Sequence, residues 1–147
     1  MFFESYSVWF YFSGMVMTGL ESLSERVIGA VFEVSRVLGA GFLEKVYERA
    51  LVRELEMRGM RVQRQVPLPV SYKGELVGEY FADLMVEDEL LVELKCVELL
   101  NLEHRAQCLN YLRASGRNVC LLVNFQRARV QVKRVVLDFE AVVGFVG

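Results

Sequence analysis

The sequence predicts an α/β fold: a mixed β-sheet flanked by helices, in the order helix, helix, strand, strand, strand, helix, strand, strand. Two observations carry this prediction. Two amphipathic helical segments precede three consecutive strand-like segments, and a further helical segment separates the third strand from two more. A helix between two strands allows a parallel crossover connection, so both strand directions are expected in one sheet. The chain has 147 residues, 54% of them hydrophobic, which is enough for a core and argues against disorder. We expect residues 21–147 to form a single domain.

Three helices are predicted, over residues 22–38, about 42–58 and 99–114. The first opens with Ser22 and Glu25 at the spacing of a capping box, and apolar residues then recur at helical intervals. Glycines follow the end of each predicted helix, as is common where a helix stops. The three helical segments are therefore bounded by their own sequence signals.

Five strands are predicted, over residues 62–72, 78–86, 90–97, 119–125 and 130–137. Pro67 and Pro69 lie in the first, and proline cannot donate to a sheet ladder, so we expect an edge or bent strand there. The fourth is a continuous apolar run, which is typical of a strand buried on both faces.

The second and third strands form a predicted hairpin around residues 87–89, and its charged residues are the main candidates for chemistry. If Asp88 is the centre of the turn, Asp83 and Glu93 face each other directly, and Lys95 lies on the same face as Glu93. Opposed like charges repel, so a compensating cation is expected. Carboxylates without histidine or cysteine partners favour Mg²⁺ or Mn²⁺. The alternative is a surface ion pair on a solvated strand face, against which the strongly apolar neighbours argue.

Two helices supply further candidates. Glu44 and Tyr47 lie on one stripe of the second helix, so Glu44 shares a face with groups expected to pack inward. Gln107 and Tyr111 share a face of the helix that follows Lys95, and could donate hydrogen bonds to a phosphate or to the hairpin carboxylates. Each has a plainer alternative: a partly exposed helix glutamate, and an ordinary polar helix face or a core tyrosine.

The net charge of −2 is unevenly distributed. Residues 75–103 hold nine acids against Lys95 alone, whereas residues 105–147 hold seven basic residues against two acids. A carboxylate-rich patch followed by an arginine-rich segment suits a metal site beside an anionic ligand. The three cysteines have no C-x-x-C spacing, which with a single histidine argues against zinc and fits a reducing cytoplasm.

Residues 1–20 form a hydrophobic N-terminal arm of uncertain status, with seven aromatic residues among the first twelve. The arm lacks the basic start of a signal peptide, and its apolar run is shorter than the roughly 18 residues of a membrane span. It could pack on the domain, bind a protein partner or a second copy, or result from a start codon assigned too early, with Met15 and Met17 as alternative starts.

The arrangement of Asp83, then Glu93-Leu94-Lys95, preceded by the helical Glu44, resembles the PD-(D/E)XK nuclease superfamily. Gln107-x-x-x-Tyr111 resembles the additional motif of its RecB-like exonuclease branch. These pieces are individually common, and their combination is specific.

Gly41, Glu44 and Tyr47 are spaced as Gly-x-x-Glu-x-x-Tyr, which is similar to the signature of the small GxxExxY family. The resemblance covers about residues 22–136. The chain departs from the family at Ala40, where proline is usual, at Ser35, where histidine is frequent, and at Gln126, where glycine is usual. None of these departures removes a metal ligand.

The resemblance implies a restriction-endonuclease-like fold and a divalent-metal-dependent nuclease that hydrolyses phosphodiester bonds, with DNA as the favoured substrate. Asp83 and Glu93 would bind Mg²⁺ or Mn²⁺, with the backbone carbonyl of Leu94 as a further ligand and Glu44 binding directly or through water. Lys95 would position the attacking water.

By the same resemblance, Gln107 and Tyr111 would orient the scissile phosphate. Contacts to the nucleic-acid backbone are expected from Arg105, Arg113, Arg117, Arg127 and Arg129. The alternative function is a non-catalytic interaction or nucleic-acid-binding module that retains the same fold.

Overall fold

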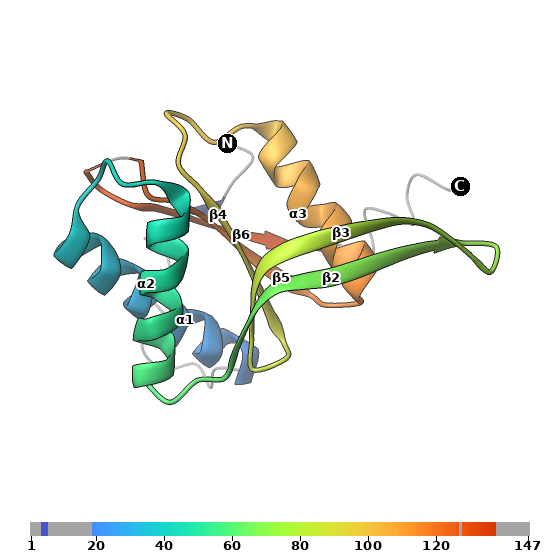
Figure 1. The fold of residues 1–147 in the computed structure, drawn as a ribbon, viewed down its shortest axis with the longest axis horizontal. Coiled ribbons are helices and arrows are strands. Elements are labelled where there is room, and N and C mark those ends of the chain that lie inside the picture. The colour runs from blue at the N-terminus through green and yellow to red at the C-terminus, as the bar shows by residue number, and fades with distance from the viewer. Residues whose placement is uncertain (1–3, 6–18, 127, 138–147) are drawn as a thin grey trace.

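The computed structural model describes residues 4–5, 19–126 and 128–137 (Figure 1). The predicted mixed sheet flanked by helices is confirmed, and so is the order of the predicted elements. The elements are β1 (Glu4–Ser5), α1 (Gly19–Leu38), α2 (Glu44–Met57), β2 (Val62–Tyr72), β3 (Glu75–Val86), β4 (Leu90–Lys95), α3 (Leu102–Ser115), β5 (Val119–Asn124) and β6 (Gln131–Val136).

The sheet has six strands in the order β1-β6-β5-β4-β3-β2. Strands β4 and β5 are parallel because α3 crosses between them, and the other neighbouring strands are antiparallel. The proline-containing β2 is an edge strand, which is one of the two predicted alternatives. The short β1, which the sequence did not predict, pairs with β6 at the other edge.

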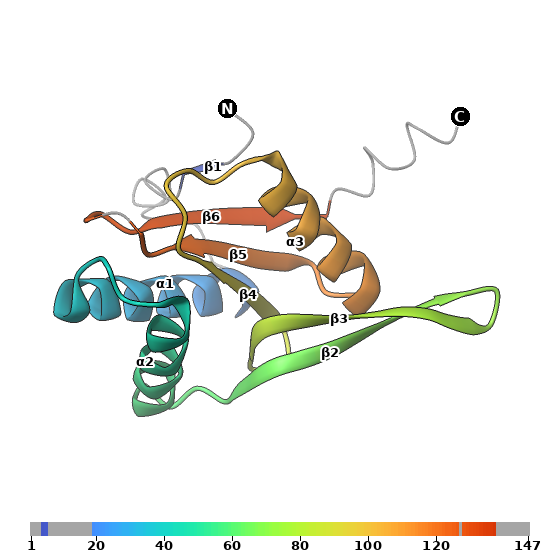
Figure 2. The same ribbon diagram turned by 45° about the horizontal axis from the view of Figure 1, so that its top comes forward.

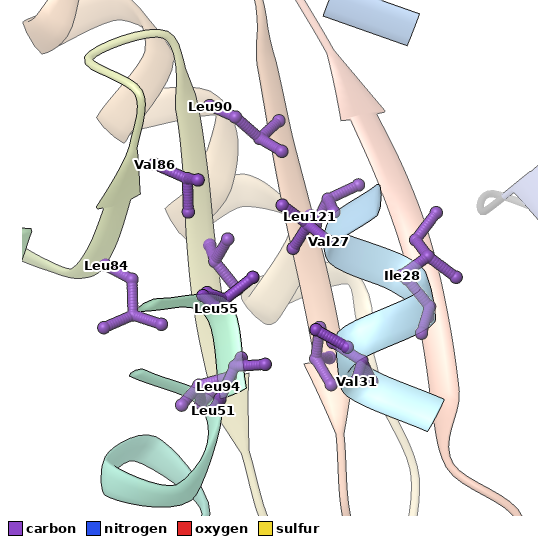
Figure 3. Packing of buried hydrophobic residues seen from close by; sticks show 14 of the residues in the cluster. Val27, Ile28, Val31, Leu51, Leu55, Leu84, Val86, Leu90, Leu94 and Leu121 are labelled. Atoms are coloured by element: carbon purple, nitrogen blue, oxygen red, sulfur yellow. The ribbon is translucent and has the colours of Figure 1, made fainter. Parts of the chain in front are cut away.

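Helices α1 and α2 cover one face of the sheet and α3 covers the other (Figure 2). Val27 of α1, Leu55 of α2 and Leu121 of β5 all belong to the larger core layer (Figure 3). Each fully buried side chain of this size stabilises the fold by about 1.5–3 kcal/mol relative to an exposed one. No helix in the described part of the chain is long and apolar enough to cross a bilayer.

The side chains of β4 alternate between the two cores, and this alternation decides on which face of the sheet Glu93 lies. Leu90, Val92 and Leu94 belong to the core under α1 and α2, whereas Leu91 belongs to the core under α3. Since successive side chains of a strand point to opposite faces, Glu93 lies on the face covered by α3.

Strand β3 changes faces at Asp83. Leu84 packs in the core under α1 and α2, yet Ala82, two residues earlier, packs in the core under α3. The β2–β3 ladder omits the position between them, where Gln65 adopts a left-handed φ of 49°. An unbroken strand would keep positions 82 and 84 on one face, so Gln65 and Asp83 mark a local irregularity. Beyond it, the hairpin projects from the body of the sheet (Figure 2).

Helix α3 begins at Leu102 rather than at residue 99 because Asn101 caps it. The Asn101 side chain accepts a hydrogen bond from the His104 backbone N–H at 3.0 Å, and the His104 Nδ1 accepts one from the Asn101 N–H at 3.1 Å. This reciprocal pair satisfies two backbone donors that a helix start otherwise leaves unpaired.

Tyr47 pins the loop before α2. Its buried ring stacks on Phe125, with centroids 4.5 Å apart and planes within 4°. Its hydroxyl donates to the Gly39 carbonyl and accepts from the Phe42 N–H at 3.2 Å. Gly41 has a φ of 107°, which strains any residue with a Cβ. The loop therefore delivers Glu44, the first residue of α2, to a defined place.

We expect Tyr47→Phe to reduce the free energy of unfolding by about 1–2 kcal/mol, since it keeps the stacked ring but removes the two hydrogen bonds of the hydroxyl, to the Gly39 carbonyl and from the Phe42 N–H. Urea unfolding followed by circular dichroism measures the change. Tyr72→Phe, at an exposed position near the tip of the β2–β3 hairpin, should change stability by less than about 0.5 kcal/mol. Equal effects of the two substitutions would refute the pinning role of the Tyr47 hydroxyl.

Candidate active site

Strands β3 and β4 bring Asp83, Glu93 and Lys95 together in the predicted register. The ladder pairs Val86 with Leu90 and continues to Leu84 with Val92, so Asp83 and Glu93 are the next positions. The backbone pairing of β3 with β4 stops before this pair. In its stead the Asp83 side chain bonds to the neighbouring strand, since its Oδ2 accepts a hydrogen bond from the Leu94 backbone N–H at 2.8 Å. Asp83 is thus fixed by the backbone of the neighbouring strand.

The Glu93 carboxyl group is buried, with only 4% of the residue exposed. Its Oε1 lies 3.5 Å from the Lys95 Nζ, and its buried Oε2 has no hydrogen-bond partner among the described residues. Burial raises the pKa of Glu93 to about 9; the charge of Asp83 adds to this, and Lys95 opposes it. Without a cation, the carboxyl group therefore keeps its proton at neutral pH.

The donor chemistry fits a hard divalent cation. An unpartnered, buried carboxylate oxygen beside a second carboxylate is the environment that Mg²⁺ or Mn²⁺ stabilises. Within the described ranges, no three carboxylate, imidazole or thiol groups converge into a metal cluster. Backbone carbonyl and water oxygens would have to supply the other positions of a coordination shell.

Glu44 lies at the N-terminus of α2, near enough to the hairpin for the charges of Asp83 and Lys95 to shift its pKa. Partial burial raises its pKa, the charge of Asp83 raises it further, and Lys95 opposes the rise. The hydrogen bonds and ion pairs of the described residues do not link Glu44 directly to Asp83 or Lys95. Glu44 therefore borders the carboxylate pair without contacting it.

The sequence analysis missed Glu48 and Gln65. Glu48 is 2% exposed, and its carboxylate contacts the Lys45 Nζ at 2.8 Å and the Arg64 Nε at 3.5 Å. The Gln65 Nε2 lies 3.1 Å from Glu48 Oε1 and 3.3 Å from Asp83 Oδ1, so one amide bridges both acids.

The pKa of Glu48 falls below its ordinary value: burial pushes it upward, but the hydrogen bonds from Lys45 and Gln65 outweigh burial. Glu48 is one turn after Glu44, and this spacing was a usable signal. Gln65 carried no such signal, because a left-handed residue inside a strand pattern is not visible in composition or periodicity.

Helix α3 places Gln107 and Tyr111 over the carboxylates. The Gln107 Nε2 donates to the Tyr111 Oη at 2.8 Å. The pKa of Tyr111 is raised by burial and then by the negative charges of Glu93 and Asp83, so its hydroxyl remains a donor at neutral pH. The structure therefore brings these two residues to the hairpin site.

The arginines predicted to contact nucleic acid lie at different ends of the sheet. Strands β4 and β5 run parallel, from the Leu90–Val119 pair to the Lys95–Asn124 pair. Arg117 precedes β5 and forms a 3.1 Å ion pair with Asp88 in the turn before β4. It therefore lies at the end of the sheet opposite Lys95.

Arg113 is in the last turn of α3, also toward that opposite end, and it donates to the Asn110 Oδ1 at 3.1 Å. Arg105 is in the first turn of α3, and Arg129 is exposed in the segment after β5, so both lie at the end where Lys95 stands. Arg127 lies outside the described residues.

A mixed sheet that brings together a buried glutamate, a partly buried aspartate and a lysine is the arrangement expected of a PD-(D/E)XK nuclease, and comparison with known families agrees. The chain belongs to the PD-(D/E)XK nuclease superfamily, whose family model matches residues 21–135. A search of curated proteins finds no sequence match.

Two solved structures share the fold. The crystal structure of SSO0001 has a TM-score of 0.53 and 19% identity, over 86% of this chain and 64% of that protein. The alkaline exonuclease LHK-Exo from Laribacter hongkongensis has a TM-score of 0.51 and 16% identity, over 88% of this chain and 76% of that one. This chain thus spans less than two thirds of SSO0001, and the likeness to both concerns the fold.

The raised pKa of Glu93 predicts how stability depends on pH. Without divalent ions, the unfolded carboxyl group ionises near its ordinary value of 4.5, whereas the folded one keeps its proton up to about 9. The free energy of unfolding should therefore fall between these values as pH rises, by an amount on the order of a few kcal/mol.

Chemical unfolding at several pH values, in the presence of a chelator, measures this fall. Glu93→Gln cannot ionise and should show a shallower decline than the wild type. Asp88→Asn makes the same acid-to-amide change at an exposed turn and should decline with pH as steeply as the wild type. A Glu93→Gln curve parallel to the wild type would refute the buried, protonated state.

Proposed function

We propose that this protein is a divalent-metal-dependent nuclease of the GxxExxY type that hydrolyses phosphodiester bonds, with DNA as its substrate. The observation that carries the proposal is the buried Glu93 carboxylate, with an unpartnered oxygen, between Asp83 and Lys95. Burying such a group without a partner is costly, and a fold retains this arrangement where a ligand compensates it.

Asp83 and Glu93 would hold Mg²⁺ or Mn²⁺, with the Leu94 backbone carbonyl as a third ligand and Glu44 acting through water. Such a cation supplies charge neutralisation at the phosphate and lowers the pKa of a bound water. The Lys95 side chain is 18% exposed, and its Nζ lies 3.5 Å from the Glu93 Oε1. From there the ammonium group can donate a hydrogen bond to the attacking water. Gln107 and Tyr111 would donate to the non-bridging phosphate oxygens.

The Gly-x-x-Glu-x-x-Tyr spacing supports the narrower family assignment, because each motif residue has a distinct physical role. Gly41 supplies a backbone conformation that favours glycine, and Tyr47 pins the same loop from the core. Glu44 is the residue that this loop presents toward the charged hairpin. Arg105 and Arg129, at the Lys95 end of the sheet, are the arginines best placed to contact the phosphate backbone.

A non-catalytic interaction module remains the competing function. The specific observation in its favour is the outer β2–β3 hairpin, where large apolar side chains such as Leu76 and Val77 are exposed. A partner or second copy bound through the aromatic N-terminus stays a prediction, since apart from residues 4–5 and 19–20 that arm lies outside the described residues. A cytoplasmic location is likewise proposed, supported by three free cysteines.

Addition of Mg²⁺ or Mn²⁺ should raise the melting temperature, because a ligand that binds only the folded state stabilises it by about 2.7 kcal/mol at 100 times its Kd. Differential scanning calorimetry measures the shift. Asp83→Asn should abolish it, and Asp88→Asn, an equal charge change at the hairpin turn, should preserve it. A similar shift in the wild type and Asp83→Asn would place any metal elsewhere and favour the interaction module.

Lys95→Ala should lower kcat on a labelled DNA duplex or single strand by on the order of 100- to 1,000-fold, with metal affinity unchanged within a few fold, because the ammonium acts mainly as the transition state develops. Steady-state cleavage and metal titration give the two quantities. Lys73→Ala, at the exposed hairpin turn, is the matched lysine control and should retain kcat. Undiminished cleavage by Lys95→Ala would refute the catalytic role.

A further inference from the structure

An open hollow of about 420 Å³ adjoins the carboxylate site, between α3 and the β2–β3 hairpin. Its lining includes Tyr80 from β3 and Glu103, His104, Gln107, Asn110 and Tyr111 from α3. This volume lies within the range of about 300–1,000 Å³ that is typical of small-molecule sites. The hollow therefore has room for part of a nucleotide.

The hollow shares two residues with the proposed active site. Gln107 and Tyr111, proposed to contact the scissile phosphate, also line the hollow. Tyr111 senses the charges of Glu93 and Asp83, and the positive charge of Lys95 helps to lower the pKa of His104 after the larger effect of burial. A group bound in the hollow would thus lie beside a phosphate held at the carboxylates.

The lining is unsuited to a second phosphate. Its residues include no lysine or arginine, and the Glu103 carboxylate would repel an anion. Because the Nδ1 of His104 accepts a hydrogen bond from Asn101, the neutral ring carries its proton on Nε2. The polar groups of this hollow are therefore suited to a neutral ligand.

The lining is suited to a flat heterocycle with hydrogen-bonding edges. Tyr80 is 46% exposed, and its ring lies 5.9 Å from that of Tyr111 at an angle of 53°, so part of its surface is open to a ligand. The side-chain amides of Gln107 and Asn110 offer both donors and acceptors, as does a base edge. Nucleobases stack on such aromatic side chains when they are unpaired.

We propose that this hollow receives an unpaired nucleobase next to the phosphate at the carboxylates, with Tyr80 as its stacking surface. The substrate is then single-stranded nucleic acid or a locally opened duplex, since a base inside a duplex is stacked and paired. This inference rests on the proposed function and specifies its substrate.

The test separates base binding from backbone binding and from cleavage. Fluorescence anisotropy measures the Kd of two labelled strands of equal length, oligo(dT) and a fully abasic phosphodiester strand, in the Lys95→Ala background and without added divalent ions, so that neither strand is cleaved. The ratio of the two affinities reports the contribution of the bases, because both strands carry the same charge. Tyr80→Ala should reduce this ratio about 10-fold, and Tyr80→Phe should preserve it.

Tyr72→Ala is the matched control, because Tyr72 is a 62% exposed tyrosine on the same hairpin that does not line the hollow. An unchanged ratio in Tyr80→Ala, an equal loss in Tyr72→Ala, or no binding of oligo(dT) would each overturn the inference. If the ratio depends on Tyr80 but the wild type cleaves no nucleic acid with Mg²⁺ or Mn²⁺, the base site stands and the proposed catalysis falls.

Discussion

Burial of the Glu93 carboxyl group beside Asp83 is the constraint on which the rest of this structure depends. The strand that carries Glu93 is central in the sheet and buried on both faces, so little of the carboxyl group is exposed to bulk water. Its nearest charged partners are a carboxylate that opposes its ionisation and one lysine that favours it. In isolation such a strand position is unfavourable for an acid, and the raised pKa of Glu93 is the direct expression of that cost.

The neighbouring strands and helix α2 hold the other charged side chains in place around the Glu93 carboxyl group. Asp83 is held by the backbone of β4, and Gln65 ties it to Glu48 on α2. That link requires Gln65 to adopt a left-handed conformation, which costs on the order of 1–3 kcal/mol and persists only where the surrounding structure enforces it. The same irregularity sends the hairpin out alongside α3, where Tyr80 meets Tyr111. One strained residue thus shapes both the carboxylate site and the hollow beside it.

The two faces of the sheet contribute differently. The core under α1 and α2 supplies most of the apolar packing, and the first turns of α2 place Glu44 and Glu48 toward the charged hairpin. The smaller core under α3 is polar at one end, where Tyr111 and Gln107 approach the acids. A rigid layer on one side and a more open, polar layer on the other are suited to admitting a ligand from the α3 side.

Local signals in the sequence were sufficient for the element order, for β2 as an edge strand and for the hairpin register. Prolines, glycines, the continuous apolar run of β5 and the spacing around Asp88 act over a few residues. The predicted ends of helices were less accurate. Helix α3 was predicted to begin at residue 99, but several polar residues near this point can cap a helix, and the structure uses Asn101.

Three features were determined only by the tertiary structure. They are the hydrogen bonds that join Glu48 and Asp83 through Gln65, the placement of the arginines at two opposite ends of the sheet, and the hollow between Tyr80 and α3. These features join residues that are far apart in the chain. Their formation depends on how the hairpin bends and on how α3 crosses the sheet, and no local pattern encodes either.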